Sequence, residues 1–464
     1  MLKTKQSKAT LITVVITFFI IMLSAVSTKA ASESSRIEEI IKHKINVEKN
    51  AIGVAVVVIE GEKTNFITAG TMGQQAQKEI TRDSLFEIGS ITKTFTSIAL
   101  ASMVKEGKVK LSDPVQKYMP ENVTMPIKNS KPITLLSLAN HSSGLPRLAN
   151  NMPFADPQDP YADYTVELMY EFLNGYTLPR EVGAVREYSN LAVGLLGHVL
   201  ALIDGKSYEQ VINDRVLKPL NMSNTLIHVP EAQQSNLSLG HNEAMKQTKA
   251  WQLPSLAAAG ALKSNINDMT TYLQANMSGN PLSEELNLTH LKTANFGAPG
   301  MDIGLGWILK TDKDNQYIWH NGGTGGFRSF MGFNKKNQKG IVILTNSVHE
   351  LDPVGFAYLT GNLSKIKLTK PVVLSTESLQ KLNGNFELTP NFIMTITDQD
   401  QQLFLQATGQ QKVLFTALSE TEFVNKTVQA KIVFELNKNG EAESLTLHQG
   451  GQVMKAKKLT PENN

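Results

Sequence analysis

Cysteine is absent from the 464-residue chain. This absence excludes disulfides, thiolate metal sites, a cysteine nucleophile and a lipid anchor attached to cysteine. Histidine is scarce, and the nine residues are scattered singly, without an HExxH motif or a pair spaced to place two imidazoles on one helix face. The sequence therefore predicts a protein that holds no metal and no cofactor.

The chain also lacks a large excess of charge of either sign. The formal net charge is +3, but residues 1–30 contribute four lysines and no acidic residue, which leaves 41 basic against 42 acidic residues in the remainder. Without a basic surplus there is no electrostatic footprint for nucleic acid, so we expect no nucleic-acid partner. The length and the 41% hydrophobic composition are sufficient for two or three separate cores.

An uncharged apolar run lies near the N-terminus. Three lysines precede this run, which covers residues 11–26, and small residues follow it at 27–31. This order is typical of an export signal, predicted over residues 1–30, and it indicates a secreted or extracytoplasmic protein. The alternative is a membrane association through an uncleaved segment 11–26, although a comfortable span needs about 20 apolar residues.

Strand patterns occur at both ends of the region 31–366 and are rare in its middle. An amphipathic helix at Arg36–Val47 precedes a β-branched hairpin over residues 52–67, and comparable strand patterns return only in four late segments, 304–309, 317–320, 327–333 and 340–344. The stretch between them is helical and rich in loops. We therefore predict an α+β domain with one antiparallel sheet, flanking helices and a helical subdomain.

The pattern changes from residue 367 onwards. Short segments of alternating polarity follow one another to the C-terminus, and Asn439-Gly440 between two of them is a strong hairpin turn signal. Residues 367–464 are therefore predicted to form a separate, small all-β barrel domain.

The candidate nucleophile is Ser90 in the sequence Phe86-Glu87-Ile88-Gly89-Ser90-Ile91-Thr92-Lys93. A helix that begins at or just before Ser90 places Lys93 one turn later on the same face, within reach of the serine hydroxyl. A serine hydroxyl is a weak nucleophile, and an amine kept neutral by burial can accept its proton. A helix N-terminus also favours the negative charge that develops on an attacked carbonyl.

The Ser-x-x-Lys motif alone is weak evidence, because it occurs four times, at Ser90, Ser102, Ser364 and Ser378. Ser102 lies near the end of the same helix, where the dipole has the wrong sign. The alternative for Ser90 is a plain helix-capping role.

Two further motifs follow Ser90 in a definite order. Tyr188-Ser189-Asn190 precedes an apolar helix, so that Tyr188 could act as a phenolic acid or base and Asn190 could hold substrate through its amide. His320-Asn321-Gly322-Gly323 follows a strand, and its glycines allow another backbone to approach closely, as an enzyme requires to hold a peptide by strand addition. These four residues are therefore predicted to bind substrate. The alternatives are a buried structural tyrosine, a capping asparagine and a glycine-rich turn.

The order Ser-x-x-Lys, Tyr-x-Asn, His-x-Gly resembles the serine β-lactamase and penicillin-binding protein superfamily, within it the class C β-lactamase-like branch. Residues 133–146, 188–198, 218–222 and 304–307 also resemble that branch, so the likeness runs from about Ile37 to Ser364. The tail from about Ser378 resembles the lipocalin-like domain that is often appended to such hydrolases.

The resemblance implies a role for each motif residue. Ser90 would be acylated, with Lys93 and Tyr188 sharing the general acid and base work, and Asn190 would bind the substrate amide. The backbone N–H groups of Ser90 and Gly323 would form the oxyanion hole.

The third motif departs from the class C pattern. Class C β-lactamases carry Lys-Thr-Gly where this chain has His320-Asn321-Gly322, which replaces a fixed cation with a group that can be neutral. Our hypothesis is that His320 tunes Tyr188 and Lys93, whereas Arg328 helps to hold a substrate carboxylate.

The resemblance predicts an exported serine hydrolase that forms an acyl-enzyme on Ser90. The leading expectation is a D-alanyl-D-alanine carboxypeptidase or D-peptidase whose substrate is a peptide or peptidoglycan fragment, with β-lactams as further ligands. A class C-like β-lactamase, an esterase, and a non-catalytic penicillin-binding or scaffold protein are the alternatives. The oligomeric state and the role of the barrel stay open.

Overall fold

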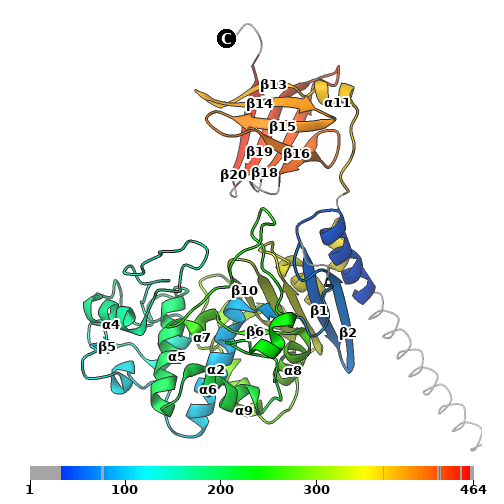
Figure 1. Cartoon of the computed structure of the whole chain (residues 1–464). Helices are drawn as coiled ribbons and strands as arrows, with labels where there is room; N and C mark the ends of the chain where they lie inside the picture. The colour runs from blue at the N-terminus through cyan, green and yellow to red at the C-terminus, as the bar shows by residue number, and fades with distance from the viewer. Residues whose placement is uncertain are drawn as a thin grey trace, which may run out of the picture. The chain divides into compact units, whose positions relative to one another are not determined.

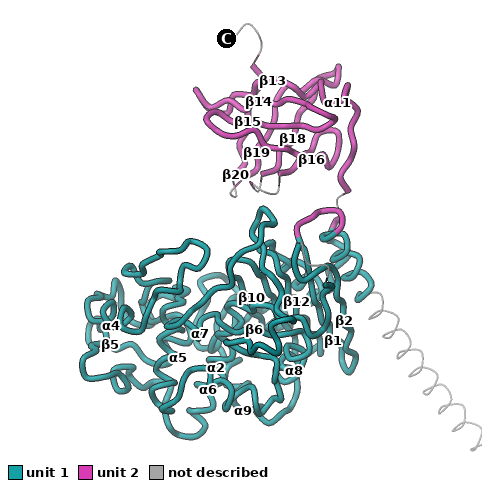
Figure 2. Tube along the Cα trace, in the orientation of Figure 1, with its two compact units in different colours: residues 1–45, 51–366 teal, residues 46–50, 367–464 magenta. Residues whose placement is uncertain are grey.

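A computed structural model describes residues 33–74, 78–368, 370–425, 428, 430–449 and 452–459. The chain divides into two compact units (Figure 2): residues 51–366 with the helix that precedes them, and residues 367–464 with the short segment 46–50. The expected export signal lies outside the described residues.

The first unit is built on an antiparallel sheet of eight strands, as the sequence predicts. Both ends of the unit contribute to it, because β1 (Gly53–Glu60) pairs with both β2 (Lys63–Gly70) and β12 (Lys339–Thr345). The side chains of β1 are buried on both faces, which explains its uninterrupted β-branched run. In spatial order the strands are β2 (Lys63–Gly70), β1 (Gly53–Glu60), β12 (Lys339–Thr345), β11 (Arg328–Asn334), β10 (Asn315–Gly323), β9 (Ile308–Asp312), β8 (Met301–Ile303) and β7 (Ala294–Asn295).

Helices cover both faces of this sheet and form the predicted helical subdomain. On β11, Phe330 packs against Phe356 of α10, while Phe333 packs against Trp307 on the opposite face. In Figure 1, α4 and α5 lie on the other side of α2 from β1 and β2. The helices are residues 33–46, α2 (Thr92–Lys105), α3 (Leu135–Ala139), α4 (Val166–Gly175), α5 (Asn190–Asp204), α6 (Tyr208–Ile212), α7 (Ala257–Gly260), α8 (Ile266–Met277), α9 (Ser283–Thr289) and α10 (Asp352–Leu359).

The second unit is a closed, eight-stranded antiparallel barrel preceded by the short helix α11 (Thr376–Gln380), which confirms the predicted all-β domain. Alternate side chains fill its interior, among them Phe386, Phe423 and Phe434, whose rings meet edge to face. Its strands are β13 (Gly384–Thr389), β14 (Phe392–Gln399), β15 (Gln402–Ala407), β16 (Val413–Ala417), β17 (Glu422–Asn425), β18 (Ala430–Leu436), β19 (Ala442–Gln449) and β20 (Gln452–Lys458).

Over the described residues, no single helix is long and apolar enough to cross a membrane. Helix α5 and the segment Tyr208–Leu217, which are bent by 81° relative to each other, meet the criteria of length and composition only as a pair.

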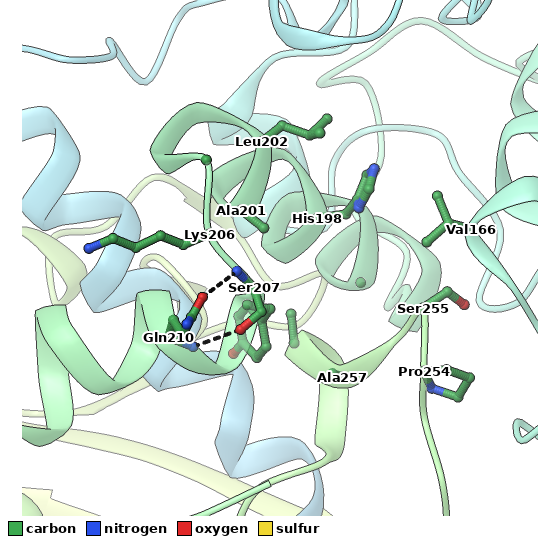
Figure 3. Close-up of a pocket in the computed structure, with 14 residues that line it drawn as sticks. Val166, His198, Ala201, Leu202, Lys206, Ser207, Gln210, Pro254, Ser255 and Ala257 are labelled. Carbon is green, nitrogen blue, oxygen red and sulfur yellow. Dashed lines mark hydrogen bonds between the residues drawn. The ribbon is translucent and has the colours of Figure 1, made fainter.

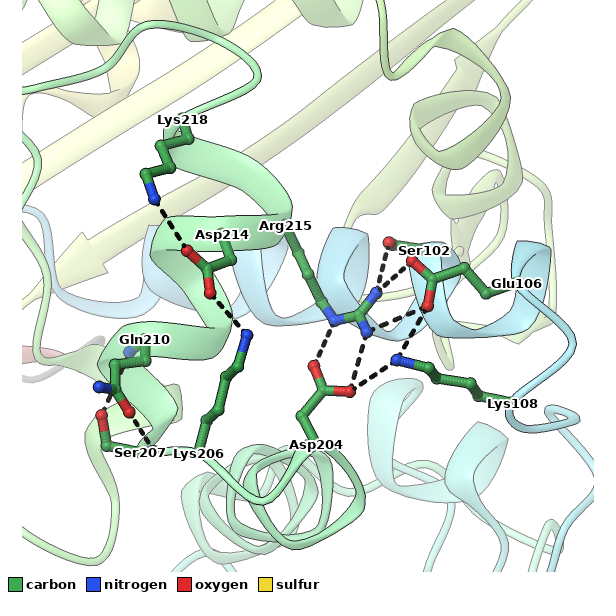
Figure 4. A network of polar contacts seen from close by, with 10 residues as sticks. All are labelled: Ser102, Glu106, Lys108, Asp204, Lys206, Ser207, Gln210, Asp214, Arg215 and Lys218. Carbon is green, nitrogen blue, oxygen red and sulfur yellow. Dashed lines mark hydrogen bonds and ion pairs between the residues drawn. The ribbon is translucent and has the colours of Figure 1, made fainter.

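A buried arginine ties the C-terminal ends of α2 and α5 together (Figure 4). The guanidinium of Arg215 donates to Asp204 at 2.6 Å, to Glu106 at 2.8 Å and to the hydroxyl of Ser102 at 2.9 Å. The second Ser-x-x-Lys serine is therefore part of a structural ion-pair network rather than a nucleophile centre.

We expect Arg215→Met to lower the free energy of unfolding by about 3 kcal/mol, because it leaves Asp204 buried without its main counter-charge. Lys206→Met is the matched control, since its ion pair with Asp214 is exposed and worth less than about 1 kcal/mol. Urea unfolding measures both. Arg215 holds the pKa of Asp204 below its ordinary value, so this stabilisation is present above that ordinary value and is lost as the pH falls through the lowered pKa. Equal stability of the two variants at pH 7 would contradict the prediction.

Candidate active site

Ser90 lies in a tight turn that is docked on the end of β10. Strand β3 (Phe86–Glu87) leads into a 3₁₀ turn, Gly89–Ile91, which continues directly into α2. Gly89 has a φ of 51°, and a Cβ at this position would lie 2.6 Å from the backbone nitrogen of Gly323. Only glycine therefore allows the serine turn and the end of β10 to approach this closely.

The side chains of Lys93 and Tyr188 both lie within hydrogen-bonding distance of the Ser90 hydroxyl, as the motifs predict. The Oγ of Ser90 lies 2.9 Å from Nζ of Lys93 and 2.7 Å from the hydroxyl oxygen of Tyr188. Lys93 also donates to the carbonyl oxygen of Ala259 in α7 at 2.6 Å, which fixes the direction of the amine. Ser90 itself keeps part of its surface exposed.

Burial sets the protonation states of the amine and the phenol. Lys93 is completely buried, and desolvation, followed by the positive charge of Arg147, holds its pKa well below the ordinary lysine value. Desolvation raises the pKa of Tyr188 to about 12 against the opposing hydrogen bond to Ser90. Both shifts favour the uncharged forms, a protonated phenol beside an amine whose lone pair can accept the Ser90 proton.

His320 lies near this group as a neutral imidazole. Its Nδ1 donates to the carbonyl oxygen of Asn321 at 2.5 Å, and its ring centroid is 6.5 Å from that of Tyr188. Burial, reinforced by the charge of Lys93, lowers the pKa of His320 to about 3. The imidazole can therefore accept a hydrogen bond through Nε2 but supplies no fixed positive charge.

The alternation of β10 divides the rest of this motif between two faces. Gly322 faces the serine turn, since a Cβ there would lie 2.0 Å from the carbonyl oxygen of Ile88. Asn321 points the other way and donates to Asp352 of α10 at 2.6 Å. Gly323 also faces that side, because a Cβ on it would lie 1.8 Å from a guanidinium nitrogen of Arg328.

The candidate carboxylate ligand Arg328 is thus packed behind Gly323. Its Nε donates to the carbonyl oxygen of Val348 at 3.0 Å, and its charge opposes the burial that raises the pKa of Asp352 to about 6. Its predicted contact with substrate, like that of the Asn321 side chain, stays a prediction.

Asn190 begins α5 and presents an unused acceptor. Its backbone N–H donates to the carbonyl oxygen of Arg147 at 3.0 Å, whereas its Oδ1 is buried without a hydrogen-bond partner. The preceding Ser189 caps the helix by accepting from the backbone N–H of Ala192. A free acceptor at this place is suited to an incoming amide N–H.

Sequence reasoning assigned no role to four groups that the fold brings to the site. His141 packs against Tyr188, Arg147 lies 5.1 Å from the centre of the Tyr188 ring, the carbonyl of Ala259 holds Lys93, and Glu87 is buried just before the serine turn. The sequence feature that could have identified His141 is its position in residues 133–146, which resemble the class C β-lactamase-like branch. Within the described part of the chain, no cluster of three or more histidine and carboxylate side chains could hold a metal ion.

A pocket of about 480 Å³ lies next to α5 and α7, apart from the three groups at Ser90. Figure 3 shows His198 and Ser207 among its lining residues, together with Ala257. His198 is held by the hydroxyl of Tyr170, at 2.5 Å from Nε2. Because His198 is not among the groups at Ser90, a substitution of it can serve as a control for substitutions of the histidines near Ser90.

The fold and the amine, hydroxyl and phenol grouped at Ser90 define a serine hydrolase. The chain belongs to the Beta-lactamase family, whose sequence model matches residues 35–360. A second model, a domain of unknown function (DUF3471), matches residues 369–460, which include the barrel.

The relatives bear two kinds of name. A β-lactamase of Escherichia coli is 29% identical over 70% of this chain and 93% of its own length. The D-alanyl-D-alanine-carboxypeptidase/endopeptidase AmpH of the same organism is 31% identical over 64% of this chain and 80% of its own length.

Solved structures confirm the predicted fold of the first unit. A β-lactamase/D-alanine carboxypeptidase from Yersinia pestis has a TM-score of 0.63 at 25% identity and covers 73% of this chain and 99% of its own. A class C β-lactamase has the same TM-score at 23% identity, with 72% and 97% covered. The family match confirms the β-lactamase resemblance inferred from the motifs, and the class C structure shares the fold.

Proposed function

We propose that this protein is an exported D-alanyl-D-alanine carboxypeptidase or D-peptidase that acts through an acyl-enzyme on Ser90. The observation that carries the proposal is the position of the Ser90 hydroxyl between the buried amine of Lys93, whose pKa is lowered, and the phenol of Tyr188, whose pKa is raised. The composition of residues 1–30 supports export.

In acylation, Lys93 accepts the Ser90 proton as Oγ attacks the carbonyl carbon before the terminal D-residue. The oxyanion receives hydrogen bonds from the backbone N–H groups of Ser90 and Gly323, worth about 3 kcal/mol each in comparable enzymes. Tyr188 protonates the departing amine and is reprotonated from Lys93. The carbon–nitrogen bond breaks, an ester forms on Ser90, and water then hydrolyses the ester.

An imidazole whose pKa is about 3 offers a substrate carboxylate no positive charge at neutral pH. Because a β-lactam and a peptide that ends in D-alanine both carry such a carboxylate, His320 does not separate a peptidase from a β-lactamase. The carboxypeptidase relative, at 31% identity, supports the peptidase. A β-lactamase activity is the second candidate, supported by the match over 93% of the length of the Escherichia coli enzyme.

A substrate panel separates these candidates. The purified protein is incubated with a peptide ending in D-Ala-D-Ala, a labelled penicillin and an aryl acetate, and D-alanine release and adduct decay are followed. We expect D-alanine release and a penicillin adduct that lasts for minutes or longer. Rapid penicillin turnover would instead support the β-lactamase, and hydrolysis of the ester alone would support an esterase. Absence of every reaction would refute a catalytic role.

We expect that the acylation rate does not depend on the protonation of His320 between pH 5 and pH 8. Its pKa of about 3 lies below that window, so the imidazole is neutral throughout it. His320→Gln retains a neutral hydrogen-bonding group and should give a pH profile of the same shape, measured as the rate of penicillin adduct formation. An acid limb near pH 6 to 7 that His320→Gln removes would show instead that the imidazolium takes part.

A further inference from the structure

His141 fixes the backbone on both sides of Tyr188. It follows α3, has a φ of 62° and is almost completely buried. Its carbonyl oxygen accepts from the backbone N–H of Glu187 at 2.8 Å, and its Nδ1 accepts from the backbone N–H of Ser189 at 3.1 Å. One residue therefore holds the peptide groups before and after the phenol.

The same imidazole supports the Tyr188 ring. The two ring centroids are 4.6 Å apart and the planes are tilted by 34°. Because Nδ1 accepts a hydrogen bond, the proton must be on Nε2 and the ring must be neutral. Burial, and then the charges of Lys93 and Arg186, keep the pKa of His141 well below its ordinary value, with smaller effects from His320 and Arg147.

We propose that His141 is a positioning residue that holds the hydroxyl of Tyr188 at Ser90 through its carbonyl oxygen and Nδ1. The inference rests on the proposed acyl-enzyme chemistry. Tyr188 reaches Ser90 across 98 residues of sequence, at 2.7 Å, from a segment outside any helix. Since a displacement of about 1 Å can reduce a rate about 100-fold, the clamp by His141 sets the efficiency of proton transfer.

The left-handed backbone at His141 allows a sharp comparison of two variants. Asparagine and glycine both tolerate a positive φ, so neither His141→Asn nor His141→Gly adds serious backbone strain. Both remove the imidazole ring, but only asparagine keeps a side-chain acceptor near the position of Nδ1. A difference between the variants therefore reports the contact with the Ser189 N–H. His198→Asn, which changes the pocket histidine, is the matched control.

The measurement is penicillin adduct formation over a range of concentrations, which separates the maximal acylation rate from the concentration dependence, together with thermal unfolding. We expect His141→Gly to lower the maximal acylation rate about 100-fold with little change in half-saturating concentration. His141→Asn should recover most of this loss, and His198→Asn should acylate as the wild type does.

Two results would overturn the inference: a His141→Gly variant that acylates at the wild-type rate, or a His141→Asn variant that loses as much as His141→Gly. If His141→Gly does not fold, His141→Asn is compared with the wild type instead: near-wild-type acylation supports the inference, and an acylation rate lowered about 100-fold in a folded His141→Asn protein overturns it. Failure of the wild type to form any adduct would refute the proposed function instead, so the two failures are distinguishable.

Discussion

Ser90→Ala is expected to abolish covalent labelling and to lower turnover at least about 10⁴-fold, as loss of the nucleophile does in other serine hydrolases. The methyl group fits the space of the hydroxymethyl group, and Lys93 retains its bond to the Ala259 carbonyl, so the fold should persist. The expected loss is therefore chemical. It is measured as D-alanine release and as adduct mass after exposure to penicillin.

Ser102→Ala provides the matched control for Ser90→Ala. Both serines stand three residues before a lysine, but the Ser102 hydroxyl accepts a hydrogen bond from the Arg215 guanidinium. Its removal should lower the free energy of unfolding by about 1–3 kcal/mol and leave acylation unchanged. Labelling that survives Ser90→Ala, or that disappears in a folded Ser102→Ala protein, would refute the assignment of the nucleophile.

Lys93→Met is expected to lower the maximal acylation rate about 10³-fold, within the usual range for loss of a general base. Methionine has a similar length and is apolar, so it fills a completely buried site without the amine. Ser90 keeps its hydrogen bond to Tyr188 but has no group to take its proton. Adduct formation at saturating penicillin measures this loss, with substrate binding expected to change little.

The pH dependence of Lys93→Met identifies the amine as the base. Lys93 has a lowered pKa, so wild-type acylation should fall as the pH decreases through that pKa, and this limb should be missing in the variant. The pKa of Lys93 is lower in the folded protein than its ordinary value of about 10.4, so the buried amine destabilises the fold below that pH, and Lys93→Met should be more stable than the wild type at neutral pH. The stability difference should shrink as the pH approaches 10.4.

Lys105→Met is the control for this experiment, because Lys105 belongs to the second Ser-x-x-Lys motif and forms ion pairs with the exposed Glu284 and the buried Glu285. It should leave the acylation rate and its pH profile unchanged. An acid limb that persists in Lys93→Met would assign the titration to another group and contradict the proposed role of the amine.

Sequence patterns alone predict the antiparallel sheet, the helix that begins near Ser90 and the barrel. Each depends on local preference: β-branched runs favour strands, and Gly89 is compatible with the left-handed turn before a helix. Ser90 and Lys93 are one helical turn apart, so their proximity follows from the rise of the helix alone. The antiparallel sheet built from both ends of the domain followed from where the strand patterns occur.

The pKa shifts at the site, and the contacts that hold its side chains in place, depend on the tertiary structure. The Lys93 pKa is lowered because surrounding segments exclude water from the amine, and its carbonyl partner is 166 residues away. No local pattern encodes such burial. The roles of Arg147 and His141 likewise appear only when loops distant in sequence are brought against Tyr188.

The third motif shows the same division. Its residue types predict that the fixed cation is missing. The structure shows in addition that His320 is buried and neutral, and that Asn321 and Arg328 lie toward α10. Strand alternation assigns neighbouring residues to opposite faces, but only the packing of the serine turn and α10 decides which face meets Ser90. Local sequence predicts short-range geometry, such as the spacing of Ser90 and Lys93. Burial, and contacts between residues far apart in the sequence, depend on how the core is assembled.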